Sequence, residues 1–261
     1  MTLITDRKIM KRYTRLTSSK VLNSLTLSTL ALAFVLLGSG CFGDTICIEG
    51  DGPIVSETRS TGTFSKVNLP DAFDVILVPD TTHFVIIEGQ ENLVDRMETS
   101  VSGDRLTVRF PGCYRRAEPL RAYIHSAMFN EVDLRGSGDL WSDGVLLTDN
   151  FNLELTGSGD VDLQIEASDM LSTRISGSGD VILSGLATAV DYDILGSGNI
   201  EAFGLLAVDA DVEITGSGDV DVYASGELSV RISGSGDVRY KGNPTITEVV
   251  ITGSGSLINA E

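Results

Sequence analysis

The chain has 261 residues, of which 37 are Asp or Glu and 19 are Lys or Arg, so its formal net charge at pH 7 is −18. Residues 41–261 alone hold 36 acidic and 13 basic side chains, a net charge of −23. Nucleic acid needs a basic surface for its phosphates, so this balance excludes it as a natural partner. An acidic surface suits an exported body that resists non-specific adsorption, and it can also attract cationic ligands or divalent ions.

Residues 1–40 have the layout of a secretory signal. Residues 1–20 carry six basic side chains, the segment 21–37 is apolar and uncharged, and the small residues GSG follow at 38–40. This order of basic, apolar and small residues is typical of a signal peptide. If translation starts at Met10 instead of Met1, the signal peptide still has an ordinary basic region.

The end of this segment, LLGSGC at 36–41, resembles a lipobox. It predicts cleavage before Cys41 and lipid attachment to its thiol, although Gly38 stands where a Leu is usual. The alternatives are conventional cleavage after a small residue, or retention of 21–37 as a membrane anchor near the short limit for a span. We expect a lipid-anchored cell-envelope protein, in the outer membrane and facing the periplasm or the cell surface, with residues 41–56 as an acidic tether.

Two further cysteines, Cys47 and Cys113, remain if Cys41 carries lipid. In an oxidising compartment the simple expectation is that they form a disulfide, and the alternative is two separate thiols. Neither cysteine has the spacing or the histidine neighbours of a zinc site, and His83 and His125 lie far apart in the sequence. We therefore expect no metal and no cofactor.

Residues 57–128 are predicted to form a β-rich N-terminal portion. Segments 73–79 and 83–89 are apolar or alternating around a turn, which indicates paired strands. Segment 91–97 is compatible with one helical turn, and 104–110 returns as a strand. We interpret this portion as a cover for the structure that follows, because an open solenoid end is an unpaired sheet edge.

Residues 129–261 repeat a Gly-Ser-Gly string at intervals of 18 to 21 residues. Between the strings, apolar and polar residues alternate, as in strands with one buried face. A repeat near twenty residues indicates a solenoid, in which each coil buries its apolar face against its neighbours. The predicted fold is therefore all-β: a right-handed parallel β-helix with coils of about 20 residues, stacked about 4.8 Å apart.

The strings are predicted to be corners. Two glycines in three residues suit a turn that needs a positive φ at least once, and we expect Gly218 at such a position. The Asp or Asn that follows can bond nearby backbone N–H groups. The alternative is calcium, because the string is faintly similar to the GGxGxD nonapeptide of calcium-binding β-rolls, although the period and the Gly-Ser pair differ. The corner residues are Gly136, Gly138, Asp139, Gly157, Gly159, Asp160, Gly177, Gly179, Asp180, Gly196, Gly198, Asn199, Gly216, Gly218, Asp219, Gly234, Gly236, Asp237, Gly253 and Gly255.

The serial GSGD strings and the segment 64–110, with ENLVDRMETSV at 91–101, resemble the head GIN domain family. This is a family of envelope proteins, many of them lipoproteins, named as putative autotransporter adhesins. The resemblance covers roughly residues 57–256. It implies a β-solenoid without known catalytic residues and suggests an adhesin-like role.

Three functional classes compete. The first is a lipid-anchored interaction module whose coil face contacts a glycan, an envelope polymer or a protein, and the second is a structural component that self-associates end to end. The third, a polysaccharide-active enzyme, is disfavoured because Arg174 and Arg231 are expected as solvated strand residues, and two isolated histidines indicate no Ser-His-Asp set. Tyr192 is expected in the core, so the aromatic residues do not identify a carbohydrate platform.

Overall fold

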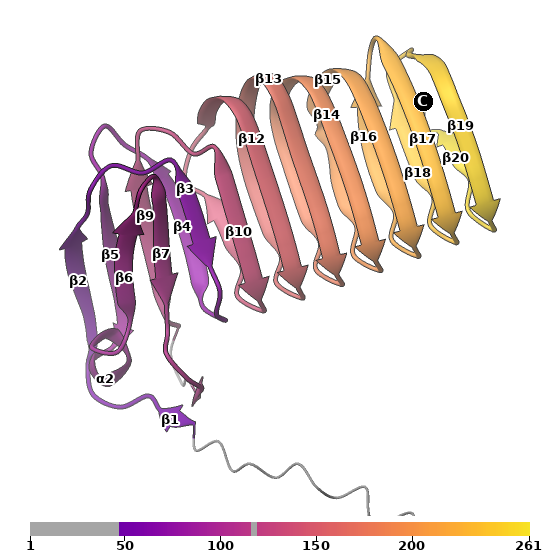
Figure 1. Cartoon of the computed structure of the whole chain (residues 1–261). Helices are drawn as coiled ribbons and strands as arrows, with labels where there is room; N and C mark the ends of the chain where they lie inside the picture. Colours follow the sequence, from indigo (N-terminus) through magenta and orange to yellow (C-terminus); the bar gives the residue numbers. More distant parts are fainter. Residues whose placement is uncertain (1–46, 116–118) are drawn as a thin grey trace, which may run out of the picture. The chain divides into compact units, whose positions relative to one another are not determined.

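The computed structural model describes residues 47–115 and 119–261, and the segment 1–40 and Cys41 lie outside them. The regular structure of the described chain is all β-strand except for one short helix, α2 (Glu91–Val94), inside the segment expected as a helical turn. None of the helices in this part of the chain is long and apolar enough to cross a membrane. Parallel coils stack one on another toward the C-terminal end (Figure 1). The predicted β-solenoid is confirmed.

In the repeat region, strands run between the corners and pair in parallel with the coils before and after them. One long strand spans each central coil, whereas the outer coils are divided into two strands. The strands are β10 (Glu131–Gly136), β11 (Leu140–Ser142), β12 (Leu146–Gly157), β13 (Val161–Gly177), β14 (Val181–Gly196), β15 (Ile200–Gly216), β16 (Val220–Ala224), β17 (Glu227–Gly234), β18 (Val238–Lys241), β19 (Thr245–Gly253) and β20 (Leu257–Asn259). This stacking satisfies the backbone groups of each inner coil and places equivalent residues in columns.

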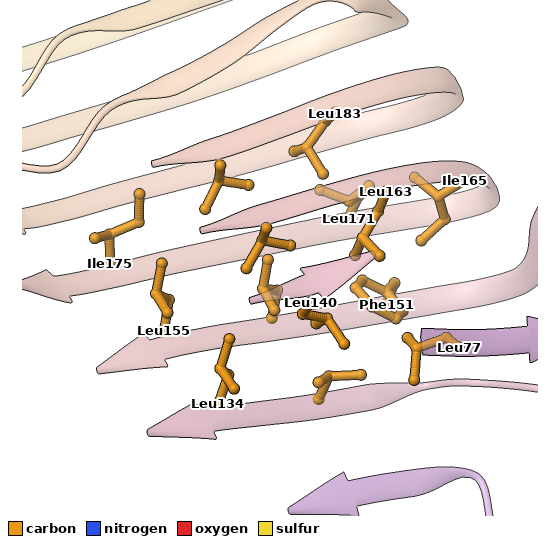
Figure 2. Packing of buried hydrophobic residues seen from close by; sticks show 14 of the residues in the cluster. Leu77, Leu134, Leu140, Phe151, Leu155, Leu163, Ile165, Leu171, Ile175 and Leu183 are labelled. Atoms are coloured by element: carbon orange, nitrogen blue, oxygen red, sulfur yellow. The ribbon is translucent and has the colours of Figure 1, made fainter. Parts of the chain in front are cut away.

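The inward columns form the core. Leu134 stands opposite Leu155, and Leu155 opposite Ile175, so that successive coils contribute equivalent side chains (Figure 2). All three are fully buried, and each such side chain contributes about 1.5–3 kcal/mol relative to an exposed one. Tyr192 lies in a neighbouring inward column at 0% exposure, which confirms its expected place in the core.

The N-terminal portion covers one end of the stack. Its strands are β2 (Ile54–Ser60), β3 (Lys66–Leu69), β4 (Asp74–Pro79), β5 (Phe84–Gln90), β6 (Glu98–Ser102), β7 (Arg105–Arg109) and β9 (Arg121–Ser126). Strands β3 and β4 pair in parallel with β10 and β11, so the solenoid sheet begins at residue 66 and has no break at residue 129. Strand β5 runs antiparallel to both β2 and β9, and β6 runs antiparallel to β7. Strands β7 and β9 pair in parallel with β3 and β4 and so continue the stack, and the antiparallel strands β6 and β5 occupy their outer edges, which a bare coil would leave unpaired.

The first coil turns its corner without a Gly-Ser-Gly string. The N–H of Val75 donates to the carbonyl of Asp139 at 2.8 Å, as equivalent residues do in later corners. A Cβ on Gly138 would lie 2.0 Å from the carbonyl oxygen of Phe73, so residues 70–73 occupy the corner position of this coil. The repeat pattern alone therefore could not locate the first coil.

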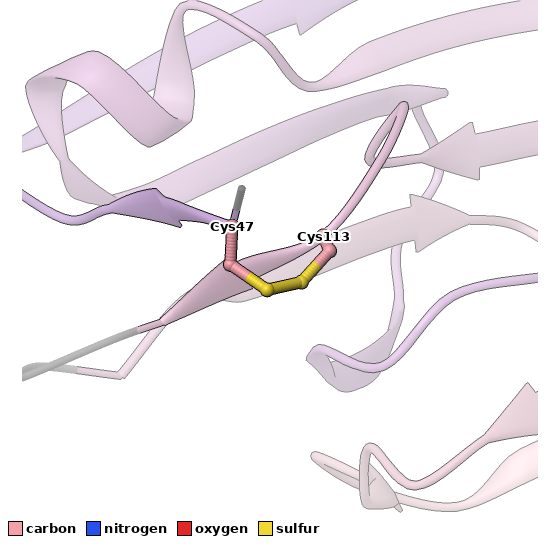
Figure 3. Close-up of a disulfide and its surroundings, with 2 residues drawn as sticks. All are labelled: Cys47 and Cys113. Carbon is pink, nitrogen blue, oxygen red and sulfur yellow. A yellow bond between two sulfur atoms is a disulfide. The ribbon is translucent and has the colours of Figure 1, made fainter. Parts of the chain in front are cut away.

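A disulfide joins Cys47 to Cys113, with their Cα atoms 4.6 Å apart (Figure 3). Beside it, β1 (Ile48–Glu49) pairs in parallel with β8 (Tyr114–Arg115). Together with the start of β2 at Ile54, this pairing places ordered strands inside the segment 41–56 that was expected as a tether.

Candidate functional site

The first glycine of every string has a positive φ, between 108° and 155°. Residues with a Cβ rarely adopt this conformation, so glycine is required there. These glycines are Gly136, Gly157, Gly177, Gly196, Gly216, Gly234 and Gly253.

The second glycine of each string is required for a different reason. Gly218 is not among the residues with positive φ, so the expectation for it was wrong. A Cβ on Gly218 would lie 1.9 Å from the carbonyl oxygen of Gly198 in the preceding coil. A Cβ on the second glycine of each other corner would be similarly close, at 2.0–2.2 Å from the nearest carbonyl oxygen. Close stacking of the coils, and not backbone conformation, therefore excludes a side chain here.

The residue after each string belongs to a hydrogen-bond column along the stack. Oδ1 of Asp160 accepts the backbone N–H of Asp180 at 3.0 Å, and Oδ1 of Asp219 accepts that of Asp237 at 2.8 Å. Asn199 fits the same column, because its side-chain amide donates to Asp180 at 2.8 Å and its Oδ1 accepts the N–H of Asp219 at 2.9 Å. The bonds donated by N–H groups satisfy backbone donors at the corners, so a structural role accounts for the column.

The geometry gives the calcium alternative no support. Neighbouring carboxylates of the column lie one coil apart, and one oxygen of each accepts a backbone N–H of the next coil. Calcium instead requires six to eight oxygens that converge on one point. In residues 47–115 and 119–261, no three His, Cys, Asp or Glu side chains are grouped so that they could hold a metal ion.

Beside the corner column, the outer face of the coils carries an open groove of about 730 Å³, which we call the Trp141 groove. It follows an outward column in which Trp141 stands opposite Asp162, followed by Ile182 and Glu201 in the next two coils. Trp141 itself is half-buried. The other lining residues are Asp139, Leu140, Ser142, Asp160, Val161, Gln164, Asp180 and Ser184.

The lining of the Trp141 groove combines an indole ring with polar acceptors. An aromatic face can pack on a sugar ring, and carboxylate, amide and hydroxyl groups can bond its hydroxyl groups. Five of the lining residues are acidic and none is Lys or Arg. The groove therefore suits a neutral or cationic ligand and disfavours an acidic one.

A second groove, of about 610 Å³, is mainly apolar. Its outward column contains Leu147, Glu166, Leu186 and Leu206 in successive coils. The three leucines are 61%, 50% and 47% exposed, so they form an apolar strip on the surface. Such strips often mark contact surfaces.

The outward arginines are held in ion pairs. Arg174 lies 2.8 Å from Asp193, and Arg231 lies 3.0 Å from Asp211 and 2.6 Å from Glu248. The carboxylate of Asp211, followed by that of Glu248, raises the pKa of Arg231. Exposed pairs of this kind contribute about 0–1 kcal/mol each. Neither arginine lines the Trp141 groove, so neither is available to a ligand bound there.

The structure brings together one cluster that the sequence did not indicate. His83 Nδ1 lies 3.2 Å from Ser126 Oγ, and His125 Nδ1 lies 3.2 Å from Asp80 Oδ2. A hydrolytic triad needs one histidine between the serine and the acid, and an accessible serine oxygen. Here Asp80 contacts the other histidine, and Ser126 is fully buried and bonds two backbone carbonyl groups. The arrangement fits a structural hydrogen-bond cluster.

A comparison with known protein families shows to which family this chain belongs. The model of the family described as "Putative auto-transporter adhesin, head GIN domain" matches residues 63–244. The chain belongs to this family. The head GIN domain match begins just before β3, includes the corners from Gly136 to Gly236 and ends one residue before β19. The resemblance drawn from the sequence is confirmed.

Solved structures share this fold over most of the chain. A putative adhesin from Bacteroides fragilis NCTC 9343 is 26% identical, with a TM-score of 0.77, over 81% of this chain and 99% of that chain. A putative lipid binding protein from Parabacteroides distasonis ATCC 8503 is 24% identical, with a TM-score of 0.67, over 82% of this chain and 99% of that chain. A putative adhesin from Parabacteroides merdae ATCC 43184 is 24% identical, with a TM-score of 0.60, over 81% of this chain and 99% of that chain. Among curated proteins, none matches this chain.

Proposed function

We propose that the protein is an exported, lipid-anchored component of the outer membrane with a non-catalytic, adhesin-like role, and that the Trp141 groove binds its ligand. The head GIN domain family and the B. fragilis structure, both described as putative adhesins, support the envelope location and the adhesin-like role. The signal layout of residues 1–40 and the segment LLGSGC support a lipid at Cys41. The groove, with its aromatic and polar lining, is the observation that carries ligand binding.

The lining indicates the class of ligand. Five carboxylates without a basic neighbour repel a polyanion, so a neutral or amino-sugar glycan, or an envelope polymer of such sugars, is the expected partner. The same lining disfavours lyase cleavage of an acidic polysaccharide, because no Lys or Arg is present to stabilise the negative charge that develops in that reaction. Hydrolysis would need two free carboxyl groups, whereas those of Asp139, Asp160 and Asp180 each accept a backbone N–H of the next coil. Binding without catalysis is therefore the role that the groove favours.

Trp141→Ala is expected to weaken binding of the preferred glycan about tenfold or more. A central aromatic anchor contributes at least about 1.4 kcal/mol to affinity, which corresponds to that factor. A glycan array with the wild-type protein identifies the ligand, and titration calorimetry then compares the variants. Trp141→Phe is expected to keep most of the affinity, and Leu147→Ala, in the second groove, to leave it unchanged. Equal affinity for wild type and Trp141→Ala, or preference for acidic glycans, would overturn the assignment.

Cys41→Ala is expected to abolish lipid attachment, because the thiol of Cys41 is the proposed acceptor. The variant should stay unprocessed or be released from membranes. Metabolic labelling with a clickable fatty acid, followed by membrane fractionation, measures both effects. Cys47→Ala serves as the control and should retain the label. Wild-type labelling of Cys41→Ala would show that the lipid is attached elsewhere.

A further inference from the structure

The last described coil leaves core positions open. Its inward residues Ile246, Val249 and Ile251 continue the buried columns of the preceding coil but are 38%, 46% and 38% exposed. The residues opposite them in β17 are 0–2% exposed. Within the described residues, β19 pairs with β17 and β20 pairs with β18, and the other edge of each strand has no partner strand. Apolar side chains and a row of backbone hydrogen-bonding groups are therefore exposed together at this end. Figure 1 shows β19 and β20 as the last strands at the C-terminal end of the stack.

Two outward columns lose their charge at this same coil. Val250 stands opposite Arg231. Each of the preceding coils of the repeat region has a charged residue in this column. Ile258 stands opposite Arg239, and both Val250 and Ile258 are more than 40% exposed. The charged members of the first column are Asp133, Glu154, Arg174, Asp193, Glu213 and Arg231.

The corner column changes in the same way. After Gly255 it ends in Ser256, where the other corners of the repeat region carry Asp or Asn. The single acid of β19, Glu248, is paired with Arg231 at 2.6 Å. Natural edge strands are usually protected by charge, proline or a covering segment, and this nine-residue strand has no Pro, Lys or Arg.

The two ends of the stack differ, and this difference limits how a second copy can bind to the open C-terminal end. The N-terminal end is covered by the antiparallel strands β2, β5 and β6, so it offers a second copy no open parallel coil that could continue the stack head to tail. The net charge of −23 for residues 41–261 makes copies repel over most of their surface. A contact between two C-terminal ends buries like surfaces of low charge, and two-fold symmetry closes it as a dimer.

We propose that two copies of this chain associate through β19, in an antiparallel pair related by a two-fold axis at Val250. In this register, Val249 stands opposite the partner's Ile251, and Val250 stands opposite the partner's Val250. Glu248 stands opposite the partner's Thr252, so the two acids do not face each other. The pair extends the sheet across the axis, satisfies the exposed backbone groups and covers the open core. This dimer does not rest on the Trp141 groove.

Cysteine cross-linking in cells tests the proposal with the full chain. Val250→Cys places two thiols opposite each other at the axis and is expected to give a disulfide-linked dimer on non-reducing gels. Glu213→Cys, in the same outward column two coils earlier, is the matched control and is expected to stay monomeric. A Val250→Cys yield no higher than that of Glu213→Cys, or cross-linking of Val250→Cys to a different protein, would overturn the proposal.

The purified full chain in non-ionic detergent gives a second measurement. Light scattering coupled to size exclusion is expected to show a dimer for wild type at micromolar concentrations and a monomer for Val250→Lys, which sets two charges against each other at the axis. Because Val250 is exposed and faces outward, the thermal unfolding of Val250→Lys should show a folded protein. A wild-type monomer throughout this concentration range, or a Val250→Lys protein that remains dimeric, would contradict the proposed interface.

Discussion

Gly218→Val is expected to lower the free energy of unfolding by about 3 kcal/mol, the upper end of the usual cost of overpacking. A Cβ at this position would lie 1.9 Å from the carbonyl oxygen of Gly198, so the two coils must separate at the corner. The same corner supports the next coil, because a Cβ on Gly236 would lie 2.0 Å from the carbonyl of Gly218. The misfit therefore spreads to both neighbours, since the stability of a solenoid is roughly a sum of coil and interface contributions. Chemical denaturation measures the loss.

Two controls separate close packing from other causes. Gly62→Val makes the same substitution where no atom lies within 4 Å of the added Cβ, and it should cost little. Asp219→Asn should also be mild, because Asn199 already accepts the next coil's N–H in the same column. Thermal unfolding with and without chelator completes the test. A large chelator shift in wild type that disappears in Asp219→Asn would show that the corners hold calcium after all.

The Cys47→Ala/Cys113→Ala double variant is expected to lose roughly 4 kcal/mol of stability. The bond closes a loop with a sequence separation of 66 residues, and in the chain-entropy model such a cross-link restricts the unfolded chain by about this amount. In the folded state the bond lies beside β1, which is two residues long and pairs with β8, and Asn92 forms hydrogen bonds with Glu49 and Asp51. Hydrogen exchange should show the loss of protection first in residues 47–53, and denaturant unfolding gives its size.

Reduction provides the matching comparison. Wild type treated with a reductant should unfold at the same denaturant concentration as the double variant, and the double variant should not respond to reductant. Two alkylatable thiols in the non-reduced protein would show that the bond does not form. Stability unchanged by the double substitution would show that the bond does not stabilise the fold.

The two predictions concern different parts of the solenoid. The glycine substitution acts inside the stack, where every coil presses on the next, and the cysteine substitution acts on the N-terminal cover, where β1 and β8 form a small separate sheet. If coil interfaces are the main source of stability, Gly218→Val should disrupt the central coils and leave the N-terminal cover protected. Hydrogen exchange on both variants distinguishes the two patterns.

The sequence by itself determined the features that repeat locally. Alternation of apolar and polar residues defined the strands, and the regular return of the Gly-Ser-Gly string defined the coil. The inward position of Tyr192 also followed, because a period of two assigns each side chain to one face of a strand. These inferences use residues a few positions apart, where backbone geometry alone decides which way a side chain points.

Only the tertiary structure revealed the features that depend on contacts between residues far apart in the sequence. Gly218 is a glycine because Gly198, twenty residues earlier, lies against it, and no local rule shows that approach. The first coil turns at residues 70–73 with an unrelated sequence, and His83, just before β5, meets Ser126 at the end of β9. The loss of charge at Val250 became visible only when the register set it opposite Arg231. Stacking brings such residues into contact across long stretches of chain, and a single sequence does not reveal which ones meet.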